Sequence, residues 1–361
     1  MTRLRAFLPT CPRGARAAIT ALALAGGLTL GLAPATPVGA TSCTGTPATI
    51  LSLSSEMSIG GTYALPASSP TAMVVFGHGY RNDSSSWAGH LTEAAQHGLL
   101  AVAPDYTGLG AGPDFRGWPA QAGAADVVAA AQHFLASCST ITKVEVLGVS
   151  MGGNMTGLAV AAKATRADGV TPLFDYWVDV EGATNWIETW AEATAVGPGN
   201  AYAAGAAADI QAEAGGTPLT APAAFASRDV LLRHADVAGS GIKGVVMIHS
   251  VEDGLVPYDQ SRELATALRL DGRKVDVYSV LRRTGDRDPG HDQTTLTSDA
   301  SATLGDMDPF SGHAWEGSST HIVMKTAMAQ LFALVDGTEP APDNQEFVVD
   351  SGLGTVGPLP L

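Results

Sequence analysis

The stretch Val144-Glu145-Val146-Leu147-Gly148-Val149-Ser150-Met151-Gly152 joins an apolar, strand-like run to a helix-like stretch over residues 156–164. A strand that turns sharply into a helix strains the residue at the turn and projects its side chain away from the backbone. Glycine on both sides removes the Cβ atoms that would clash there. Because the chain contains 42 glycines, the pattern alone is weak, and its strand–helix context predicts that Ser150 is a nucleophile.

Strand-like and helix-like runs alternate along most of the chain. The expected strands are short apolar runs at residues 48–53, 62–65, 73–76, 99–103, 144–147, 176–180, 244–249 and 275–280. The expected helices lie at residues 85–97, 124–136, 156–164, 260–270 and 320–335. Apolar strands separated by helices are typical of a parallel sheet buried between two helical layers. The pattern therefore predicts an α/β fold with a mostly parallel central sheet and helices on both faces.

Two segments interrupt this alternation. Residues 183–240 contain no strand pattern, so we expect a helical cap inserted over the strand ends, with Trp186 and Trp190 contacting substrate. Residues 281–312 form a second irregular insertion, and the tail after Gly337 is expected to wrap or fray. The predicted organisation is a core over 41–182 and 241–336, a cap over 183–240 and a tail over 337–361.

A serine hydroxyl needs a base that takes its proton, and that base needs a carboxylate that orients it. Asp253 lies in a turn just past the expected strand at residues 244–249, at the sheet edge where the turn at Ser150 is also expected. Glu252 is the competing acid. Asp253 is therefore the predicted orienting carboxylate.

Nine histidines compete for the role of base. His313 leads directly into the last expected helix, whereas His291 lies closer to the last expected strand. The order of strand, loop, histidine and helix favours His313, and His291 remains the alternative. His321 is expected inside the helix, as a partly buried or capping residue.

Acyl transfer builds negative charge on the carbonyl oxygen of the substrate, and backbone N–H groups must stabilise that charge. Met151, the residue after the nucleophile, is the first expected donor. The second donor is expected in the loop Gly77-His78-Gly79-Tyr80, which follows the strand at residues 73–76.

Taken in order, these motifs resemble those of the α/β-hydrolase family. The residues that carry the resemblance are Gly77-His78-Gly79-Tyr80, Ala103-Pro104-Asp105-Tyr106, Gly148-Val149-Ser150-Met151-Gly152-Gly153, the Asp253 loop and Gly312-His313. The resemblance covers about residues 70–182 and 241–336 and leaves the cap unmatched. It implies an α/β-hydrolase fold, an oxyanion hole completed by the N–H of Tyr80, and a supporting role for His78. The Asp253 loop fits the family better than Glu252 does, whereas the long gap before His313 departs from its pattern.

The first forty residues have the pattern of a signal peptide. Basic residues precede an apolar stretch over residues 17–32, and Val38-Gly39-Ala40 offers small residues for cleavage. The apolar stretch is shorter than the roughly 20 residues that a membrane span needs. We therefore expect a secreted protein, cleaved near Ala40 and without a stable membrane span, with an uncleaved anchor as the alternative.

Cleavage there removes four of the 20 basic side chains and leaves 16 against 35 acidic ones, a net charge of −19. Such a surface repels phosphate backbones and anionic membranes, so nucleic acid is not an expected partner. Cys11 is lost with the signal peptide. The remaining Cys43 and Cys138 are expected to form a disulfide in an exported chain, with two separate thiols as the alternative.

Three functions fit these features. The first is a secreted, esterase- or lipase-like serine hydrolase that cleaves small or lipid-like carboxylic esters through an acyl-enzyme on Ser150. The second is a serine peptidase of the exopeptidase type, and the cap offers four acids that can hold a free amino terminus: Glu188, Glu192, Asp209 and Glu213. A noncatalytic binding protein is less favoured, because the nucleophile, acid and base are all present. No cofactor or metal is expected, since the histidines are scattered and form no His-Glu-x-x-His helix.

Overall fold

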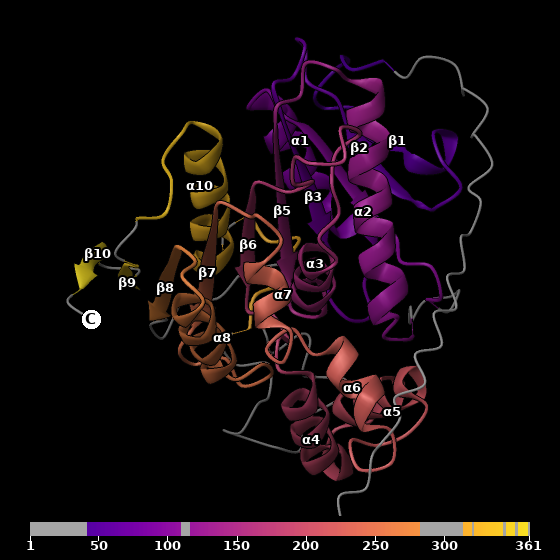
Figure 1. The fold of residues 1–361 in the computed structure, drawn as a ribbon, viewed down its shortest axis with the longest axis vertical. Coiled ribbons are helices and arrows are strands. Elements are labelled where there is room, and N and C mark those ends of the chain that lie inside the picture. The colour runs from indigo at the N-terminus through magenta and orange to yellow at the C-terminus, as the bar shows by residue number, and fades with distance from the viewer. Residues whose placement is uncertain are drawn as a thin grey trace, which may run out of the picture. The chain divides into compact units, whose positions relative to one another are not determined.

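The computed structural model describes residues 42–109, 116–281, 313–319, 321–341, 344–350 and 353–359, whose arrangement is shown in Figure 1. The expected signal peptide, its cleavage site near Ala40, and His291 all lie outside the described residues. No helix in the described parts of the chain combines the length and the apolar character of a membrane span.

A sheet of ten strands forms the centre of the described structure, in the order β1-β2-β4-β3-β5-β6-β7-β8-β9-β10. The strands are β1 (Leu51–Ser52), β2 (Gly61–Ala64), β3 (Ala72–Gly77), β4 (Leu100–Pro104), β5 (Lys143–Val149), β6 (Tyr176–Val180), β7 (Gly244–Ser250), β8 (Val275–Leu281), β9 (Glu346–Asp350) and β10 (Gly354–Leu359). All neighbouring pairs from β4 across to β9 are parallel, whereas β1–β2, β2–β4 and β9–β10 are antiparallel. The predicted mostly parallel sheet is therefore confirmed.

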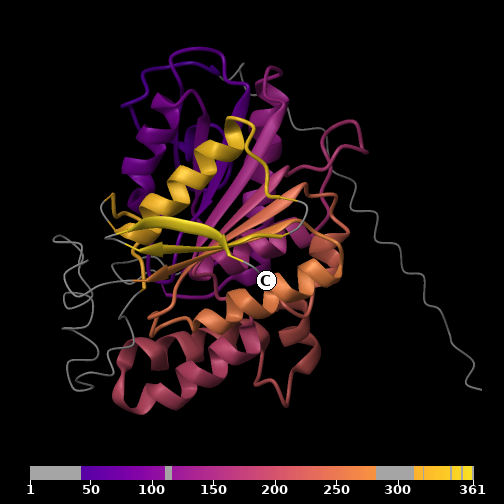
Figure 2. The same ribbon diagram turned by 90° about the vertical axis from the view of Figure 1, so that its left-hand side faces the viewer.

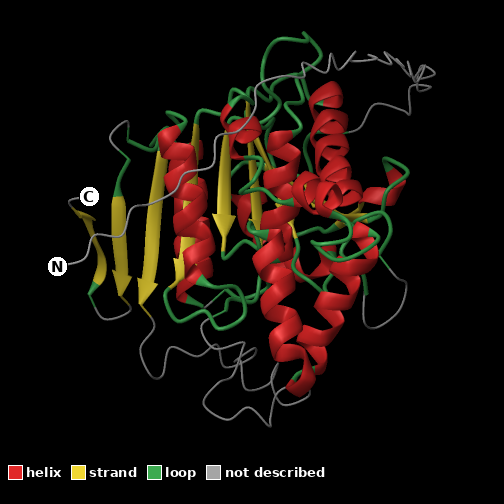
Figure 3. Ribbon diagram, turned by 60° about the horizontal axis from the view of Figure 1, so that its bottom comes forward, coloured by secondary structure: helices red, strands yellow, loops and turns green. Residues whose placement is uncertain are grey.

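Helices cover both faces of this sheet (Figures 2 and 3). Successive residues of β3 alternate between the two sides, because side chains on a strand point alternately up and down. Met73 and Val75 belong to the apolar cluster that includes α2 (Ala120–Ser137), α3 (Met151–Ala161) and α8 (Tyr258–Leu270). Val74 and Phe76 belong to the cluster with α1 (Ala88–Gln96) and α10 (Ile322–Val335). Two short 3-10 helices, η1 (Leu53–Ser55) and η2 (Ser84–Trp87), complete the core.

The parallel registers bring the carboxyl ends of neighbouring strands to one edge of the sheet. Gly77 of β3 lies opposite Gly148 of β5, Val149 of β5 lies opposite Val180 of β6, and Val180 lies opposite Ile248 of β7. The loops that follow these strands therefore leave the sheet side by side. In open α/β sheets this edge is where ligands bind.

Between β6 and β7 the chain forms helices only, as the sequence predicts. These are α4 (Trp186–Val196), η3 (Gly197–Gly199), α5 (Ala201–Ala214), α6 (Pro222–Arg228) and α7 (His234–Ala238). Asn185 and Asn200 cap α4 and α5, since each side chain accepts a hydrogen bond from an N–H in the first turn. In Figure 1, α4, α5 and α6 form one group at the bottom of the view. Their independence as a cap domain stays a prediction.

The tail does not fray but extends the sheet, which corrects the expectation for the residues after Gly337. β9 pairs in parallel with β8, and β10 returns antiparallel to β9. The ring of Phe347 stacks on that of Tyr278 with centroids 4.6 Å apart, and Arg269 pairs with Glu346 at 3.0 Å. Without β9, strand β8 would expose its unpaired N–H and C=O groups at a sheet edge.

Cys43 and Cys138 form the predicted disulfide, with Cα atoms 5.7 Å apart. It ties the start of the described chain to the residue that follows α2. The bond closes a loop with a sequence separation of 95 residues. Because closing a long loop restricts the unfolded chain more than the folded one, the disulfide stabilises the fold.

Replacing both cysteines by alanine is expected to lower the free energy of unfolding by about 4–5 kcal/mol, the chain-entropy value for a loop of this length. Urea unfolding followed by tryptophan fluorescence measures the change. The reduced parent is the control and should lose a similar amount. Equal stability of the oxidised parent and the double variant would contradict the prediction.

Candidate active site

Ser150 occupies the turn between β5 and α3, with the left-handed backbone angle φ of 57°. This conformation is strained for a residue that has a Cβ atom. Three backbone hydrogen bonds hold it. The N–H of Ser150 donates to the carbonyl of Val180 at 3.0 Å, and its own carbonyl accepts from Gly153 at 2.9 Å and from Ala183 at 3.0 Å. The sequence around Ser150 thus produces the turn expected of a presented nucleophile.

Glycine is required on both sides of this turn because backbone atoms approach it closely. A Cβ atom at Gly148 would lie 2.2 Å from the carbonyl oxygen of Gly152. A Cβ atom at Gly152 would lie 2.1 Å from the carbonyl oxygen of Gly77, in the loop after β3. The two glycines therefore allow the helix start to pack directly against the neighbouring loop.

Asp253 lies in the loop after β7 with its side chain buried. Its Oδ1 atom accepts hydrogen bonds from the N–H groups of Leu255 at 2.8 Å and Val256 at 2.9 Å. Its Oδ2 atom lies 2.7 Å from Nδ1 of His313. Burial by itself would raise the pKa of this carboxyl, but the His313 and His249 rings outweigh it and hold the pKa well below its ordinary value.

His313 is nearly buried, with a side chain 10% exposed. Because a carboxylate only accepts hydrogen bonds, the Nδ1 atom of His313 donates to Asp253, and the neutral ring then has Nε2 as its proton acceptor. Burial would lower the pKa of the ring, but the Asp253 carboxylate reverses this and raises the pKa above its usual range. The structure therefore brings the predicted acid and base into direct contact, from loops 60 residues apart in sequence.

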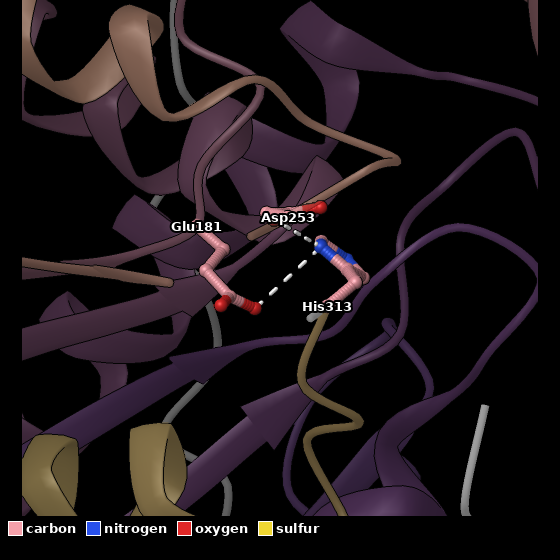
Figure 4. A group of neighbouring side chains, drawn as sticks. All are labelled: Glu181, Asp253 and His313. Atoms are coloured by element: carbon pink, nitrogen blue, oxygen red, sulfur yellow. Dashed lines mark hydrogen bonds and ion pairs between the residues drawn. The ribbon is translucent and has the colours of Figure 1, made fainter. Parts of the chain in front are cut away.

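Three buried side chains that the sequence analysis did not single out complete this cluster. His249, on β7, places Nε2 3.2 Å from Oδ2 of Asp253 and 2.8 Å from the carbonyl of Val256. Glu181, directly after β6, places Oε2 3.5 Å from the same Nδ1 atom of His313 that Asp253 contacts, as Figure 4 shows. Glu316 lies three residues after His313. Nothing in the local sequence marks Glu181 or Glu316, because their partners are distant along the chain. The partners of His249 are close in sequence, and its position four residues before Asp253 is a signal that could have found it.

The loop after β3 approaches the nucleophile from the neighbouring strand. The N–H of Gly79 donates to Oε1 of Glu316 at 2.9 Å, so this group is not available to an oxyanion. Among the described residues, the N–H groups of Tyr80 and Met151 have no backbone or side-chain acceptor. These are the two donors expected for the oxyanion hole, and that role remains a prediction.

His78 supports this loop. Its side chain is fully buried and stacks on Tyr106, with ring centroids 4.0 Å apart. Its Nδ1 atom lies 3.0 Å from the carbonyl of Gly79. Burial lowers the pKa of the ring, which keeps it neutral. This position agrees with a supporting residue and not with a base.

A clamp on Tyr80 connects the loop to α5. The hydroxyl of Tyr80 donates to Oδ2 of Asp209 at 2.5 Å, and the same carboxylate accepts from Nε of Arg116 at 2.9 Å and from the N–H of Gly117 at 3.0 Å. The hydroxyl of Tyr202, also on α5, donates to the carbonyl of Tyr80 at 3.2 Å. Two hydrogen bonds thus couple α5 to the proposed oxyanion loop, and two more join the same Asp209 carboxylate to Arg116 and Gly117.

A cavity of about 250 Å³ opens beside Ser150, between α4, α5 and the Asp253 loop. Its side-chain walls are mostly apolar or aromatic, and the residues that line it include Tyr80, Trp118, Ser150, Thr189, Glu192, Val196, Tyr202 and Leu255. Among the described residues of this lining, Glu192 is the only charged one. A partly enclosed apolar space with few polar groups is typical of a small-molecule site.

Trp186 and Trp190 do not line this cavity, which corrects their prediction as substrate contacts. Trp186 is fully buried and packs on Phe225 with ring centroids 4.8 Å apart. Trp190 contacts the same ring at 6.1 Å. Both side chains face the interior of the helical segment, because two tryptophans four residues apart on a helix lie on one face.

The structure describes Glu252 and His321 but not His291. Glu252 is exposed, whereas Asp253 is buried and contacts His313, so the structure favours Asp253. His321 caps α10 instead of lying within it, since its side chain accepts from the N–H of Val323. His291 lies outside the described residues and is not tested.

One donor atom from each of Glu181, Asp253 and His313 lies within 4.8 Å of the others, a spacing that a cation can use. However, Oδ2 of Asp253 already accepts from His313, and Oε2 of Glu181 already accepts from the N–H of Ala314. A metal ion would have to displace these hydrogen bonds. The arrangement therefore fits proton transfer better than metal binding.

The sequence model of the prolyl oligopeptidase family matches residues 85–285, more than half of the chain. The match includes the turn at Ser150 and the Asp253 loop. Among curated proteins, none matches this chain significantly.

Several solved structures have a similar fold. A puromycin hydrolase is 16% identical with a TM-score of 0.51, and the alignment covers 83% of this chain and 39% of that chain. The acylaminoacyl peptidase of Pyrococcus horikoshii is 19% identical with a TM-score of 0.46, covering 63% of this chain and 35% of that chain. A thermophilic esterase from the Planctomycetes species Thermogutta terrifontis is 14% identical with a TM-score of 0.46, covering 78% and 91%.

The chain therefore spans little more than a third of the length of the first two of these proteins. At such identities the likeness concerns the fold alone. Together with the family match, it confirms the predicted α/β-hydrolase fold.

Gly152→Ala is expected to lower kcat/KM by about 10²-fold or more, because the added Cβ collides with the Gly77 carbonyl and displaces Met151, a proposed oxyanion donor. Gly89→Ala is the matched control, since a Cβ atom there meets nothing within 4 Å. It should leave activity unchanged and alter stability by less than about 1 kcal/mol. Steady-state kinetics and thermal unfolding test both variants, and full activity of Gly152→Ala would show that the close approach is not required.

Proposed function

The chain belongs to the prolyl oligopeptidase family of serine hydrolases, and we propose that it cleaves amide bonds in short peptides through an acyl-enzyme on Ser150. The observation that carries this proposal is the 2.7 Å contact between Asp253 and His313, at the same sheet edge as the turn at Ser150. A nucleophile, a base and an orienting acid meeting on one edge support a hydrolase that uses all three.

The proposed reaction follows from the placement of these groups. The hydroxyl oxygen of Ser150 attacks the substrate carbonyl while Nε2 of His313 takes its proton, and Asp253 stabilises the imidazolium that forms. The N–H groups of Tyr80 and Met151 stabilise the negative oxygen of the tetrahedral intermediate. His313 then gives the proton to the leaving amine, and the carbon–nitrogen bond breaks to leave an ester on Ser150. Water, deprotonated by the same histidine, hydrolyses this ester and restores the hydroxyl.

The cavity supports an exopeptidase with a small apolar subsite. Of the four acids named for the cap, Asp209 pairs with Arg116 and Glu213 pairs with Arg228, each at 2.9 Å. Glu192 lines the cavity and has no cationic partner among the described residues. Burial, followed by the nearby Glu188, raises the pKa of Glu192 to about 7. A free amino group in the substrate would supply the missing positive charge and favour the ionised carboxylate.

Carboxylic esters remain the second candidate substrate class. The same triad serves esters and amides, and the apolar walls of the cavity favour an apolar acyl group. We also propose that the protein is exported. The Cys43–Cys138 disulfide supports this, because disulfides persist mainly in oxidising compartments.

Ser150→Ala and His313→Ala are each expected to lower turnover by at least about 10³-fold, because triad members act as a unit. His291→Ala should retain most activity and serves as the control for the choice of base. The assays compare aminoacyl p-nitroanilides with p-nitrophenyl esters of increasing acyl length, and a fluorophosphonate probe should label the parent but not Ser150→Ala. Undiminished turnover in Ser150→Ala would exclude the proposed reaction, and an unlabelled, inactive parent would favour a binding protein.

Glu192→Gln is expected to lower kcat/KM about 10-fold for leucyl p-nitroanilide, whose amino group is free, and to leave p-nitrophenyl butyrate almost unaffected. The 10-fold loss for the substrate with a free amino group follows from losing one charge pair in a partly buried site. Glu188→Gln is the control, because Glu188 lies on the same helix but does not line the cavity. An equal loss for both substrates would refute the amine contact and leave the serine mechanism intact.

A further inference from the structure

Glu181 is a fully buried carboxylate at the catalytic edge to which the reaction above gives no role. It directly follows β6 and has a left-handed φ angle of 49°, which is uncommon for a residue with a long side chain. Burying a charged group and straining its backbone both cost free energy unless specific contacts compensate. The contacts of Glu181 therefore indicate what it does.

The two oxygens of Glu181 hold two different loops. Oε1 accepts the N–H of Ser250, the last residue of β7, at 3.1 Å. Oε2 accepts the N–H of Ala314, the residue after His313. The loop that carries the acid and the segment that carries the base are thus fixed to one side chain.

We propose that Glu181 is a positioning residue, which holds His313 against Asp253 and stabilises the protonated form of its ring. This inference rests on the proposed function, since it assumes that His313 is the base. Glu181 does not touch the reacting atoms, and it acts through the histidine.

The geometry supports both parts of this role. Oε2 of Glu181 lies 3.5 Å from Nδ1 of His313, too far for the hydrogen bond that Asp253 makes at 2.7 Å but close enough for charge attraction (Figure 4). The ring thus faces two carboxylates, and Glu316 acts on it as a weaker third. All three favour the imidazolium that forms when Ser150 loses its proton.

Four titratable groups surround Glu181 and act on its charge. The charge of Asp253, in the loop after β7, disfavours ionisation of Glu181, and the charge of Glu181 in turn disfavours ionisation of Asp179 on β6. The rings of His313 and His249 favour ionisation of Glu181. Burial is the largest effect, followed by Asp253, and together they raise the pKa of Glu181 above its ordinary value. The second carboxylate therefore depends on its N–H contacts and on the two histidines for its charge.

The test compares kcat/KM as a function of pH in Glu181→Gln, Glu181→Asp and the parent enzyme, with p-nitrophenyl butyrate as substrate. The acid limb of this profile reports the pKa of the base in the free enzyme. A facing carboxylate raises that pKa, so Glu181→Gln should move the limb to lower pH by about one unit. It should also lower the maximal kcat/KM about 10-fold, mainly through kcat, because the ring is less well held. Glu181→Asp keeps the charge on a shorter side chain and should give an intermediate limb and rate.

Glu145→Gln is the matched control. Glu145 is also a fully buried glutamate, on β5, and its carboxylate has no hydrogen-bond partner among the described residues. Burial raises the pKa of Glu145 well above its ordinary value, which favours the neutral carboxyl. Its replacement should leave the acid limb in place, which separates a local effect on His313 from a general effect of changing a buried glutamate.

An acid limb that stays at the parent pH in either folded Glu181 variant would overturn the inference, even if the rate falls, because a merely structural role changes the rate without moving the limb. The aspartate variant keeps the test decisive if the glutamine variant does not fold, since aspartate adopts left-handed angles readily. If Ser150→Ala remains active, both the proposed function and this inference fall. If Ser150→Ala is inactive but the limb does not move, only the role of Glu181 falls.

Discussion

The hydrogen bonds between the turn at Ser150 and the end of β6 are the constraint on which the site depends. Val180 and Ala183 bond to the backbone of Ser150 from one side, and Gly153 closes the turn from the other. A left-handed serine costs about 1–3 kcal/mol, so it persists only where its surroundings determine it. Glu181 lies between these anchors, next to Gly182, and the segment that stabilises the nucleophile therefore also contacts the proposed base.

The sheet could be predicted because each strand is an apolar run of the expected length. The strand at residues 176–180 has the predicted bounds, and most others differ by one to three residues. α3 was expected to begin at residue 156 but begins at Met151, because glycines usually weaken helices and here they permit close packing. β9 and β10 were missed since an edge strand depends on a distant partner, β8, that local sequence does not reveal.

The nucleophile, acid and base could be proposed because their order along the chain and their places after strands are local features. The buried residues that support them, Glu181 and Glu316, could not be predicted in this way. Glu316 reaches Gly79 across 237 residues of sequence, and Glu181 reaches Ala314 across 133. The predicted contact of Trp186 and Trp190 with substrate was not found at the cavity for a different reason. An aromatic pair in a predicted cap indicates burial, but the sequence does not say whether the buried face meets substrate or another helix, and here it meets Phe225.

Under the proposed function, the hydrogen bond between Asp209 and Tyr80 ties the cavity wall to the loop with a proposed oxyanion donor, so the shape of the cavity and the stabilisation of the oxyanion cannot vary independently. A substitution on α5 that enlarges the cavity also pulls on the loop that carries a proposed oxyanion donor. Variation of the helical segment, by evolution or in the laboratory, is therefore restricted to positions that leave this carboxylate and its contacts with Tyr80, Arg116 and Gly117 undisturbed. Diversification toward new acyl groups should accordingly proceed from α4, which shares the cavity but not the clamp.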